Sequence, residues 1–531
     1  MPPRPPHVAV IGAGVVGAVA AVTLARAGAT VTVLHRHRGA GREAGSVPPE
    51  ATTRPASFSR IHAGDTGPGA QEDLHRLRRL AMGTWPRLAA GLPADVGLRW
   101  GGRVVWAPPP PPAAHGVKAP RPPGTMLQRG VRILQSWGYP VEQLDGAGVR
   151  EREPALVLPD GVVWGTRGDA FAAPGASAVF FGEEGHVEAE RVIDACLAVA
   201  CMLGADVRGG AEVTGIVQDP RSGVQLELAD GGLLAADVAL LAAGASTPAL
   251  GAQLGVHLPQ LHRFGGVART APLASQLLAE PGRVLEVMAG EDHPGFLVRQ
   301  CLDGSALVRL QGRPLTAAQL STGVGESEGE DAAQTAAKAL AVAARFLPAL
   351  AGVAASPLAG VRPIPGDGRP VVGYLAPSVY TIFTDSGVTL SPLVSTATHG
   401  QRCRECRLRR GNQHIQLCTG STQHTTFKLA VHIIWLVADS TQHNIGTYIL
   451  QKYWDLRNVA HCTPYSPPAS CDCICQPLCP ASHYATIHNR VQLAQLAAME
   501  ILEGAQVSLL ADFRPARFAT VGLSGGLAMQ F

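Results

Sequence analysis

The sequence predicts an α/β protein with a discontinuous Rossmann-like dinucleotide-binding domain and a second α+β domain on a mainly antiparallel sheet. Three observations support this prediction. An apolar strand, Val8–Ile11, leads into a glycine-rich turn and a helix. The apolar run at residues 237–244 ends in glycine, as a buried parallel strand does. Between residues 264 and 310, four short strand-like segments indicate another sheet.

The opening unit, residues 8–35, determines where a dinucleotide would bind. Gly12 permits a tight turn, Gly14 lets the backbone approach a pyrophosphate, and Gly17 lets the helix pack closely against the strands. The helix extends to about Gly28, and Ala29–Leu34 follows as a second strand. The free amides at the start of the helix would face the anion. A glycine motif with a strand before it and a helix and strand after it has the context that supports this interpretation.

The remaining elements follow from the spacing of apolar residues. The helical spacing predicts helices at 73–88, 188–203 and 331–346. Short apolar segments predict a strand pair at 98–106 and strands at 205–208, 211–218, 224–228, 264–270, 283–287, 295–300 and 305–310. The strands of the second sheet alternate with returns to the first, so both domains are expected to be discontinuous.

Composition excludes several classes of function. The 531 residues can form two or three domains. The net charge of +3 and the 16% of charged residues leave no basic stripe for nucleic acid. No apolar run reaches the roughly 18 residues that a membrane span needs, and Leu429–Ala438 is too short. The first strand begins near residue 8, so we expect a cytoplasmic protein, or an organellar one if the true N-terminus is missing.

The segment at about 395–490 differs from the rest of the chain. It holds all four asparagines, eight of the eleven cysteines and eight of the eighteen histidines. A zinc module would need a second knuckle to match Cys403 and Cys406, and a disulfide-rich insert would need an oxidising compartment. We favour translated non-coding sequence such as a retained intron, which predicts a disordered insert. Transcript sequencing across these codons tests this hypothesis.

Several motifs occur in an order that resembles the D-amino-acid oxidase/glycine oxidase/sarcosine oxidase family of FAD-dependent oxidoreductases. They are the glycine turn at 12–17, the stretch from Thr53 to Phe58, the strand end at 242–244, and the stretches at 360–373 and 384–392. The resemblance resumes at 493–518, and joining Val394 to about Ala494 would restore a continuous helix. It implies an FAD-binding domain at 1–65, 185–260, 360–394 and 491–518, and a substrate domain at 66–184 and 261–359.

The resemblance also implies a site and a reaction. In this family an amine or amino acid is oxidised by hydride transfer to flavin N5, and oxygen or another acceptor reoxidises the flavin. Ser57 and Ser59 match the loop along the pyrophosphate and flavin, and Arg362 matches an arginine that binds the substrate carboxylate. The stretch 387–390 matches the one that faces the N1/O2 edge of the flavin. The implied cofactor contacts are Gly12, Gly14, Val16, Gly17, His35, Ser57, Ser59, Val213, Gly244, Gly387, Val388, Thr389 and Leu390, with no metal.

Two residues depart from the family pattern and leave alternatives open. His35 stands where an acidic residue normally binds the adenosine ribose, which should cost about 1–2 kcal/mol of FAD binding. The basic run at 35–38 would suit a 2′-phosphate, so an NADP-dependent reductase is an alternative. Asp385 stands where relatives often carry histidine, and a carboxylate near the flavin opposes its reduction. A non-catalytic scaffold or assembly factor is therefore the other alternative. The substrate, the electron acceptor and the oligomeric state do not follow from the sequence.

Overall fold

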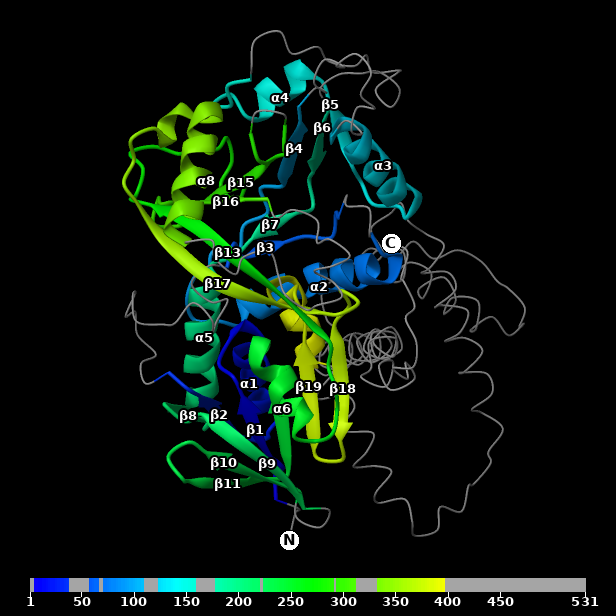
Figure 1. Ribbon diagram of the computed structural model, residues 1–531, viewed down its shortest axis with the longest axis vertical. Helices are drawn as coiled ribbons and strands as arrows, with labels where there is room; N and C mark the ends of the chain where they lie inside the picture. The colour runs from blue at the N-terminus through cyan, green and yellow to red at the C-terminus, as the bar shows by residue number, and fades with distance from the viewer. Residues whose placement is uncertain are drawn as a thin grey trace, which may run out of the picture. The chain divides into compact units, whose positions relative to one another are not determined.

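The computed structural model describes residues 4–37, 57–65, 70–108, 123–158, 177–219, 223–290, 293–311 and 332–396 (Figure 1). Nearly all of the anomalous segment, and the resumed match at 493–518, lie outside the described residues. The hypotheses about them therefore stay predictions.

The first sheet is the predicted Rossmann-like sheet. Its six strands have the order β18-β19-β12-β1-β2-β8, and all neighbouring pairs are parallel except β18 with β19. The strands are β1 (His7–Ile11), β2 (Thr30–His35), β8 (Asp206–Gly209), β12 (Val238–Leu241), β18 (Val371–Ala376) and β19 (Val379–Phe383). Because β1 and β12 are central, their carboxyl ends meet beside the glycine turn, where such sheets bind ligands.

Both faces of this sheet are covered. Val8 and Val10 of β1 belong to a core shared with helices α1 (Val15–Arg26), α2 (Glu72–Ala90) and α5 (Ala189–Met202). The alternate residues Ala9 and Ile11 pack instead toward β9 (Val213–Asp219), β10 (Gly223–Leu228), β11 (Leu233–Ala236) and α6 (Thr247–Ala252). Strand β1 is therefore apolar throughout because it is buried on both sides.

The second sheet has eight strands in the order β17-β13-β16-β15-β14-β4-β6-β5. Only β14 and β4 pair in parallel, which confirms the mainly antiparallel sheet. Its strands are β4 (Arg103–Ala107), β5 (Glu142–Leu144), β6 (Ser177–Phe181), β13 (Gln260–Thr270), β14 (Val284–Val287), β15 (Phe296–Gln300), β16 (Ala306–Leu310) and β17 (Ala355–Pro365).

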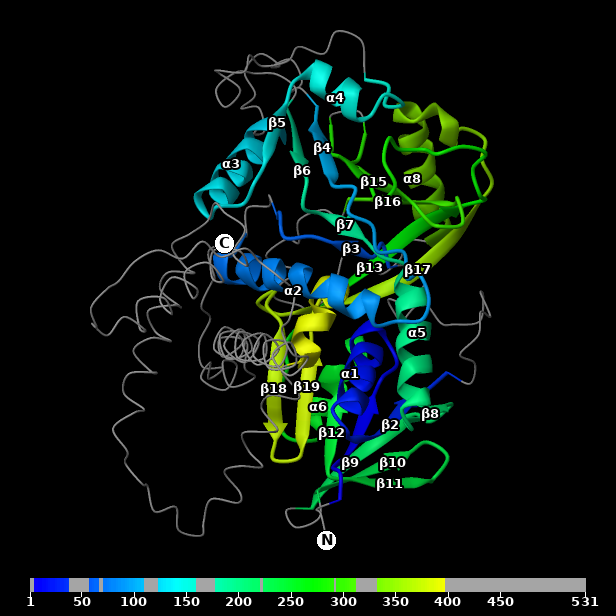
Figure 2. The ribbon, with the colours of Figure 1, turned by 180° about the vertical axis from the view of Figure 1, so that it is seen from behind.

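One face of this second sheet shares a core with α4 (Gly146–Arg152), α8 (Ala332–Phe346) and η2 (Pro348–Leu350). Helix α3 (Pro123–Ser136) contributes Leu127, Val131 and Leu134 to the core around α1 and α2. The long strands β13 and β17 run from this sheet toward β18, β19 and η1 (Gly244–Ser246) (Figures 1 and 2). At that end the side-chain amide of Gln260 donates to the backbone oxygen of Ala245, at 3.0 Å.

Three expectations differ from the structure. The strand pair at 98–106 is a single strand, β4, preceded by an isolated bridge from Arg99 to His186, because the chain changes direction at Gly102, whose φ is +77°. Strand β12 begins at Val238 rather than at Asp237, whose carboxylate instead accepts the backbone amide of His7 at 2.6 Å. It ends at Leu241, and Gly244 opens η1 with a φ of +56°. Residues 360–365, assigned above to the FAD-binding domain, pair with β13 in the second sheet.

The other predicted elements agree with the structure to within about four residues. Elements that were not predicted include helices α3, α4 and α6, strands β5, β6 and β11, and the small sheet formed by β3 (Arg60–Ile61) and β7 (Gly185–His186). In the part of the chain that the structure describes, no helix is long and apolar enough to cross a membrane. The same residues contain no group of three or more His, Cys, Asp or Glu side chains that could hold a metal ion.

Candidate cofactor and substrate pocket

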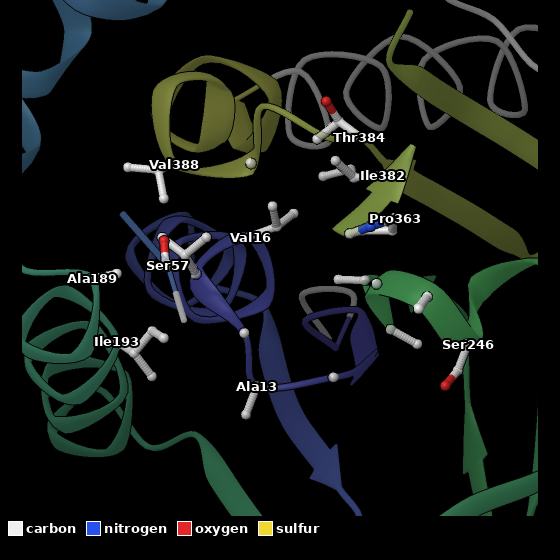
Figure 3. Close-up of a pocket in the computed structure, with 18 of the residues that line it drawn as sticks. Ala13, Val16, Ser57, Ala189, Ile193, Ser246, Pro363, Ile382, Thr384 and Val388 are labelled. Carbon is white, nitrogen blue, oxygen red and sulfur yellow. The ribbon is translucent and has the colours of Figure 1, made fainter. Parts of the chain in front are cut away.

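A single pocket joins the carboxyl ends of the Rossmann-like strands to the second sheet. Figure 3 shows labelled residues from separate segments around one space, among them Ala13, Val16, Ser57 and Val388. Of the predicted site residues, twelve line this pocket: Gly12, Gly14, Val16, His35, Ser57, Ser59, Val213, Gly244, Arg362, Gly387, Val388 and Thr389. Gly17 and Leu390 do not line it.

The three glycines of the turn have different surroundings. A Cβ at Gly12, whose φ is +108°, would lie 2.4 Å from the backbone oxygen of Ala242. A Cβ at Gly17 would lie 1.9 Å from the oxygen of Gly12, so this glycine serves helix packing. Gly14 has no atom within 4 Å of the position of its Cβ, and it opens onto the pocket. The free space that a close-lying phosphate would need is therefore at Gly14.

The start of α1, beside that space, has no side-chain cap. Gly14 is the N-cap and offers no side chain, and the first turn contains no acidic residue. The first helical hydrogen bond runs from the Ala18 amide to the Gly14 oxygen at 2.9 Å. The preceding amides of the helix therefore have no helical acceptor, and they favour a negatively charged group.

The carboxyl end of β2 carries no acidic residue, in agreement with the sequence. His35, Arg36 and His37 all line the pocket there. Another segment does bring a carboxylate to this end. Glu212, which precedes the predicted contact Val213, is exposed and lines the pocket. Glu212 was not predicted from the sequence. The hydrogen bond from the Ala211 amide to the His35 oxygen brings it beside β2.

The segment from Ser57 to His62 crosses the pocket in a constrained conformation. Ser59 has a φ of +57° and is the one non-glycine residue with positive φ among the described residues. Its hydroxyl donates to the Ser57 oxygen at 3.2 Å and lies 3.1 Å from the Ser57 hydroxyl. Thr389 Oγ1 donates to the Arg60 oxygen at 3.2 Å and accepts the His62 amide at 3.4 Å. The segment is thereby fixed to the helix that follows β19.

That helix covers residues 387–396, so it includes the first two residues of the predicted anomalous segment. The amide of Leu390 donates to the Ser386 oxygen at 3.0 Å, and its side chain is fully buried. Leu390 is therefore not a donor to the pocket. The amides of Gly387, Val388 and Thr389 precede this first helical bond and line the pocket. They are the predicted donors, and Asp385 lines the pocket beside them.

The wall formed by the second sheet is rich in positive charge. Arg60, His62, Arg309 and Arg362 line the pocket here, and only Arg362 was predicted. Arg60 pairs with Glu286 at 3.1 Å, and Arg103 binds the same carboxylate at 2.6 Å. Burial raises the pKa of Glu286, but Arg103 and Arg60 outweigh burial and hold that pKa at about 2.

The surroundings of His62 favour its neutral form. Burial, followed by the charges of Arg60 and Arg78, lowers the pKa of His62 well below 6.5. Its Nδ1 is buried without a hydrogen-bond partner, and its Nε2 lies 3.3 Å from Nη2 of Arg60. Arg60 follows Ser59 directly in the sequence and His62 lies two residues further on, and this proximity was the signal that could have added them to the predicted site.

The glycine turn on a central parallel strand, together with a pocket closed by a second, mainly antiparallel sheet, is the arrangement of a dinucleotide-binding fold. A profile of the family described as DAO, FAD dependent oxidoreductase, matches residues 7–398. The chain therefore belongs to this family of FAD-dependent oxidoreductases, which confirms the resemblance. The family match favours FAD over NADP, and oxidoreductase activity over a non-catalytic scaffold.

Individual relatives agree with the family. D-Amino acid dehydrogenase of Methylobacterium radiotolerans is 29% identical over 318 residues, covering 53% of this chain and 70% of the relative. A second, from Xanthobacter autotrophicus, is 25% identical over 323 residues, with the same coverage. Glycine oxidase from Geobacillus kaustophilus has the same fold, with a TM-score of 0.58, 21% identity, and coverage of 75% of this chain and 95% of that one.

The residues present fit FAD. The open space at Gly14 and the uncapped start of α1 suit its pyrophosphate. The unbonded amides at 387–389 suit the edge of the flavin on which negative charge develops. Between them, Val16 lies close to Gly387: a Cβ built on Gly387 would be 3.3 Å from the Val16 side chain. The two helix starts therefore lie side by side along the pocket.

Proposed function

We propose that this enzyme oxidises an amino acid or a related amine at the carbon that bears the nitrogen. Arg362 carries the proposal, because it lines the pocket and makes no hydrogen bond or ion pair with any described residue. Its planar guanidinium can bind a carboxylate through two parallel hydrogen bonds. The D-amino acid dehydrogenases among the relatives support an amino acid as the substrate.

The chain's residues would bind and orient the substrate. Arg362 would hold the carboxylate and so fix the position of the neighbouring carbon. The neutral ring of His62 would not repel the substrate's amino group, as an imidazolium would. When bound, the flavin would supply the two-electron oxidation by hydride transfer, with oxygen or another acceptor as the final oxidant.

The test is anaerobic reduction of the holoprotein by a panel of D- and L-amino acids and by amines without a carboxylate. We expect at least one amino acid to bleach the visible flavin absorption. Arg362→Met should raise the apparent KM for that amino acid by about 10- to 100-fold, the range for one lost charged hydrogen-bonded contact. It should leave amines that lack a carboxylate within a few-fold.

Arg208→Met is the matched control, because Arg208 pairs with Asp206 at the exposed edge strand β8, outside the pocket. A panel in which no amino acid bleaches the flavin of a fully loaded protein would refute the proposal. Mixing the reduced protein with oxygen, and separately with a quinone, identifies the class of acceptor.

A further inference from the structure

Two arginines of the second sheet point to the same side of it. Arg309 of β16 pairs with Val267 of β13, and Val267 pairs with Leu358 of β17. Directly paired residues share a face, and so do residues two or four apart along a strand. Arg362, four residues beyond Leu358, is therefore on the same face as Arg309. Both line the pocket.

Neither guanidinium has a hydrogen-bond or ion-pair partner in the part of the chain that the structure describes. Arg309 makes no hydrogen bond or ion pair there, and its Nε is buried without a partner. Glu286 lies on the same row of the sheet, two strands away, through Leu297. Its oxygens already accept hydrogen bonds from Arg60, from Arg103 and, at 2.6 Å, from the side-chain amide of Gln311.

Asp385 is the other carboxylate that acts on Arg309. It lines the pocket but forms no ion pair within 4.0 Å with Arg309 or Arg362. Burial, then Arg362 and Arg60, lower the pKa of Arg309 well below its usual value, and Glu286 and Asp385 offset this only in part. A carboxylate bound beside Arg309 would remove that penalty, since an unpaired buried charge is costly.

The charges of this wall leave room for one further anion. Five guanidinium groups (Arg60, Arg78, Arg103, Arg309 and Arg362) stand against four carboxylates (Asp65, Glu184, Glu286 and Asp385). A zwitterionic amino acid adds no net charge and leaves one guanidinium uncompensated. An amino acid with a second carboxylate adds one negative charge and balances the set.

We propose that the substrate is an amino acid whose side chain carries a second carboxylate, with Arg362 binding one carboxylate and Arg309 the other. This inference rests on the proposed function, which assigns the first carboxylate to Arg362. Arg309 is held in place for this role, because its guanidinium carbon lies 5.3 Å from the centre of the Phe58 ring. Phe58 itself is buried against the same sheet face.

Binding of inert acids to the holoprotein tests the inference without turnover. Glutarate and valerate have the same number of carbons but two carboxylates and one. By calorimetry we expect glutarate to bind about 10-fold more tightly or better. Arg309→Met should weaken glutarate by about 10- to 100-fold and leave valerate within about threefold, and Arg309→Lys should keep part of the preference. Equal affinities, or equal weakening of both acids by Arg309→Met, would overturn the inference and indicate that both arginines bind one carboxylate.

Turnover separates this inference from the proposed function. Glutamate with glutamine, and aspartate with asparagine, are matched pairs, and both enantiomers are compared by flavin bleaching. We expect the acidic member to be preferred, and the preference to disappear in Arg309→Met but not in Arg269→Met. Arg269 lies two residues from Val267 and pairs with Asp303 outside the pocket.

If neutral amino acids bleach the flavin as fast as acidic ones, the inference fails and the proposed function stands. If no amino acid bleaches it while glutarate binds through Arg309, the function fails and the two-carboxylate site stands. Flavin content measured for each variant shows that the pocket is intact.

Discussion

Gly14→Val should separate cofactor binding from folding. Gly14 has an extended backbone, with a φ of −72°, and no atom lies within 4 Å of a Cβ built there. The fold can therefore accept valine, at a cost of about 1 kcal/mol for an unfavourable N-cap residue. The added side chain would occupy the space that the pyrophosphate needs. Loss of two charge-assisted hydrogen bonds costs about 3–6 kcal/mol, which weakens FAD binding by about 10²- to 10⁴-fold.

The assay is a titration of the apoprotein with FAD by flavin fluorescence, together with a melting curve of each apoprotein. Gly83→Val is the matched control, because Gly83 is an exposed position of α2 where a Cβ also meets nothing within 4 Å. It should keep its FAD affinity. Unchanged FAD affinity in Gly14→Val would refute the position of the pyrophosphate. A large fall in apoprotein melting temperature would refute the claim that the space at Gly14 is free.

Three further predictions follow from other residues. Gly17→Ala should destabilise even the apoprotein, by about 3 kcal/mol, because its Cβ would lie 1.9 Å from the backbone oxygen of Gly12; a denaturant midpoint like that of the parent protein would contradict this. Glu212→Gln should raise the Kd for FAD about 10-fold in the same fluorescence titration if this carboxylate replaces the missing acid of β2, and an unchanged Kd would leave the ribose without a carboxylate partner. Burial lowers the pKa values of His62 and His186 well below 6.5, and the charges of Arg60 (on His62) and Arg299 (on His186) lower them further. Below pH 6.5 the unfolded chain therefore binds more protons than the folded one. The unfolding free energy should therefore be constant for these groups above about pH 6.5 and fall by up to about 1.4 kcal/mol per group and pH unit below it; His186→Gln should reduce this slope in urea titrations, and an unchanged slope would exclude His186 as a source.

The sequence predicted those elements whose structure is determined by neighbouring residues. The glycine turn, α1 and β2 occupy consecutive residues, so their sequence specifies both their structure and the place of the anion. The apolar run of β12 similarly indicated a strand buried on both faces. Its end was misplaced by a few residues, because Gly244 adopts a positive φ for a 3₁₀ turn rather than a strand end.

The sequence did not reveal the residues that meet through distant pairing. Arg309 reads as one polar residue in a short strand, and nothing near it in the chain indicates a pocket. It faces the pocket because β16 pairs with β13 at one register and β13 pairs with β17 at another. A shift of one residue in either pairing would turn one arginine to the opposite face of the sheet. Glu212 likewise reaches the pocket through pairing with the end of β2.

The two halves of the pocket therefore differ in what their sequence can reveal. In the proposed cofactor half, backbone amides at two helix starts would bind the cofactor, and backbone groups need only the right turn, which a glycine pattern specifies. In the proposed substrate half, side-chain charges from separate strands would bind the substrate, and their sum depends on which carboxylates are already paired. Glu286 decides this sum, because its pairing with Arg60 and Arg103 is what leaves Arg309 and Arg362 for a ligand. The order of several motifs along the chain is enough to recognise the family, but the charge of the proposed substrate depends on the ion pairs of the second sheet.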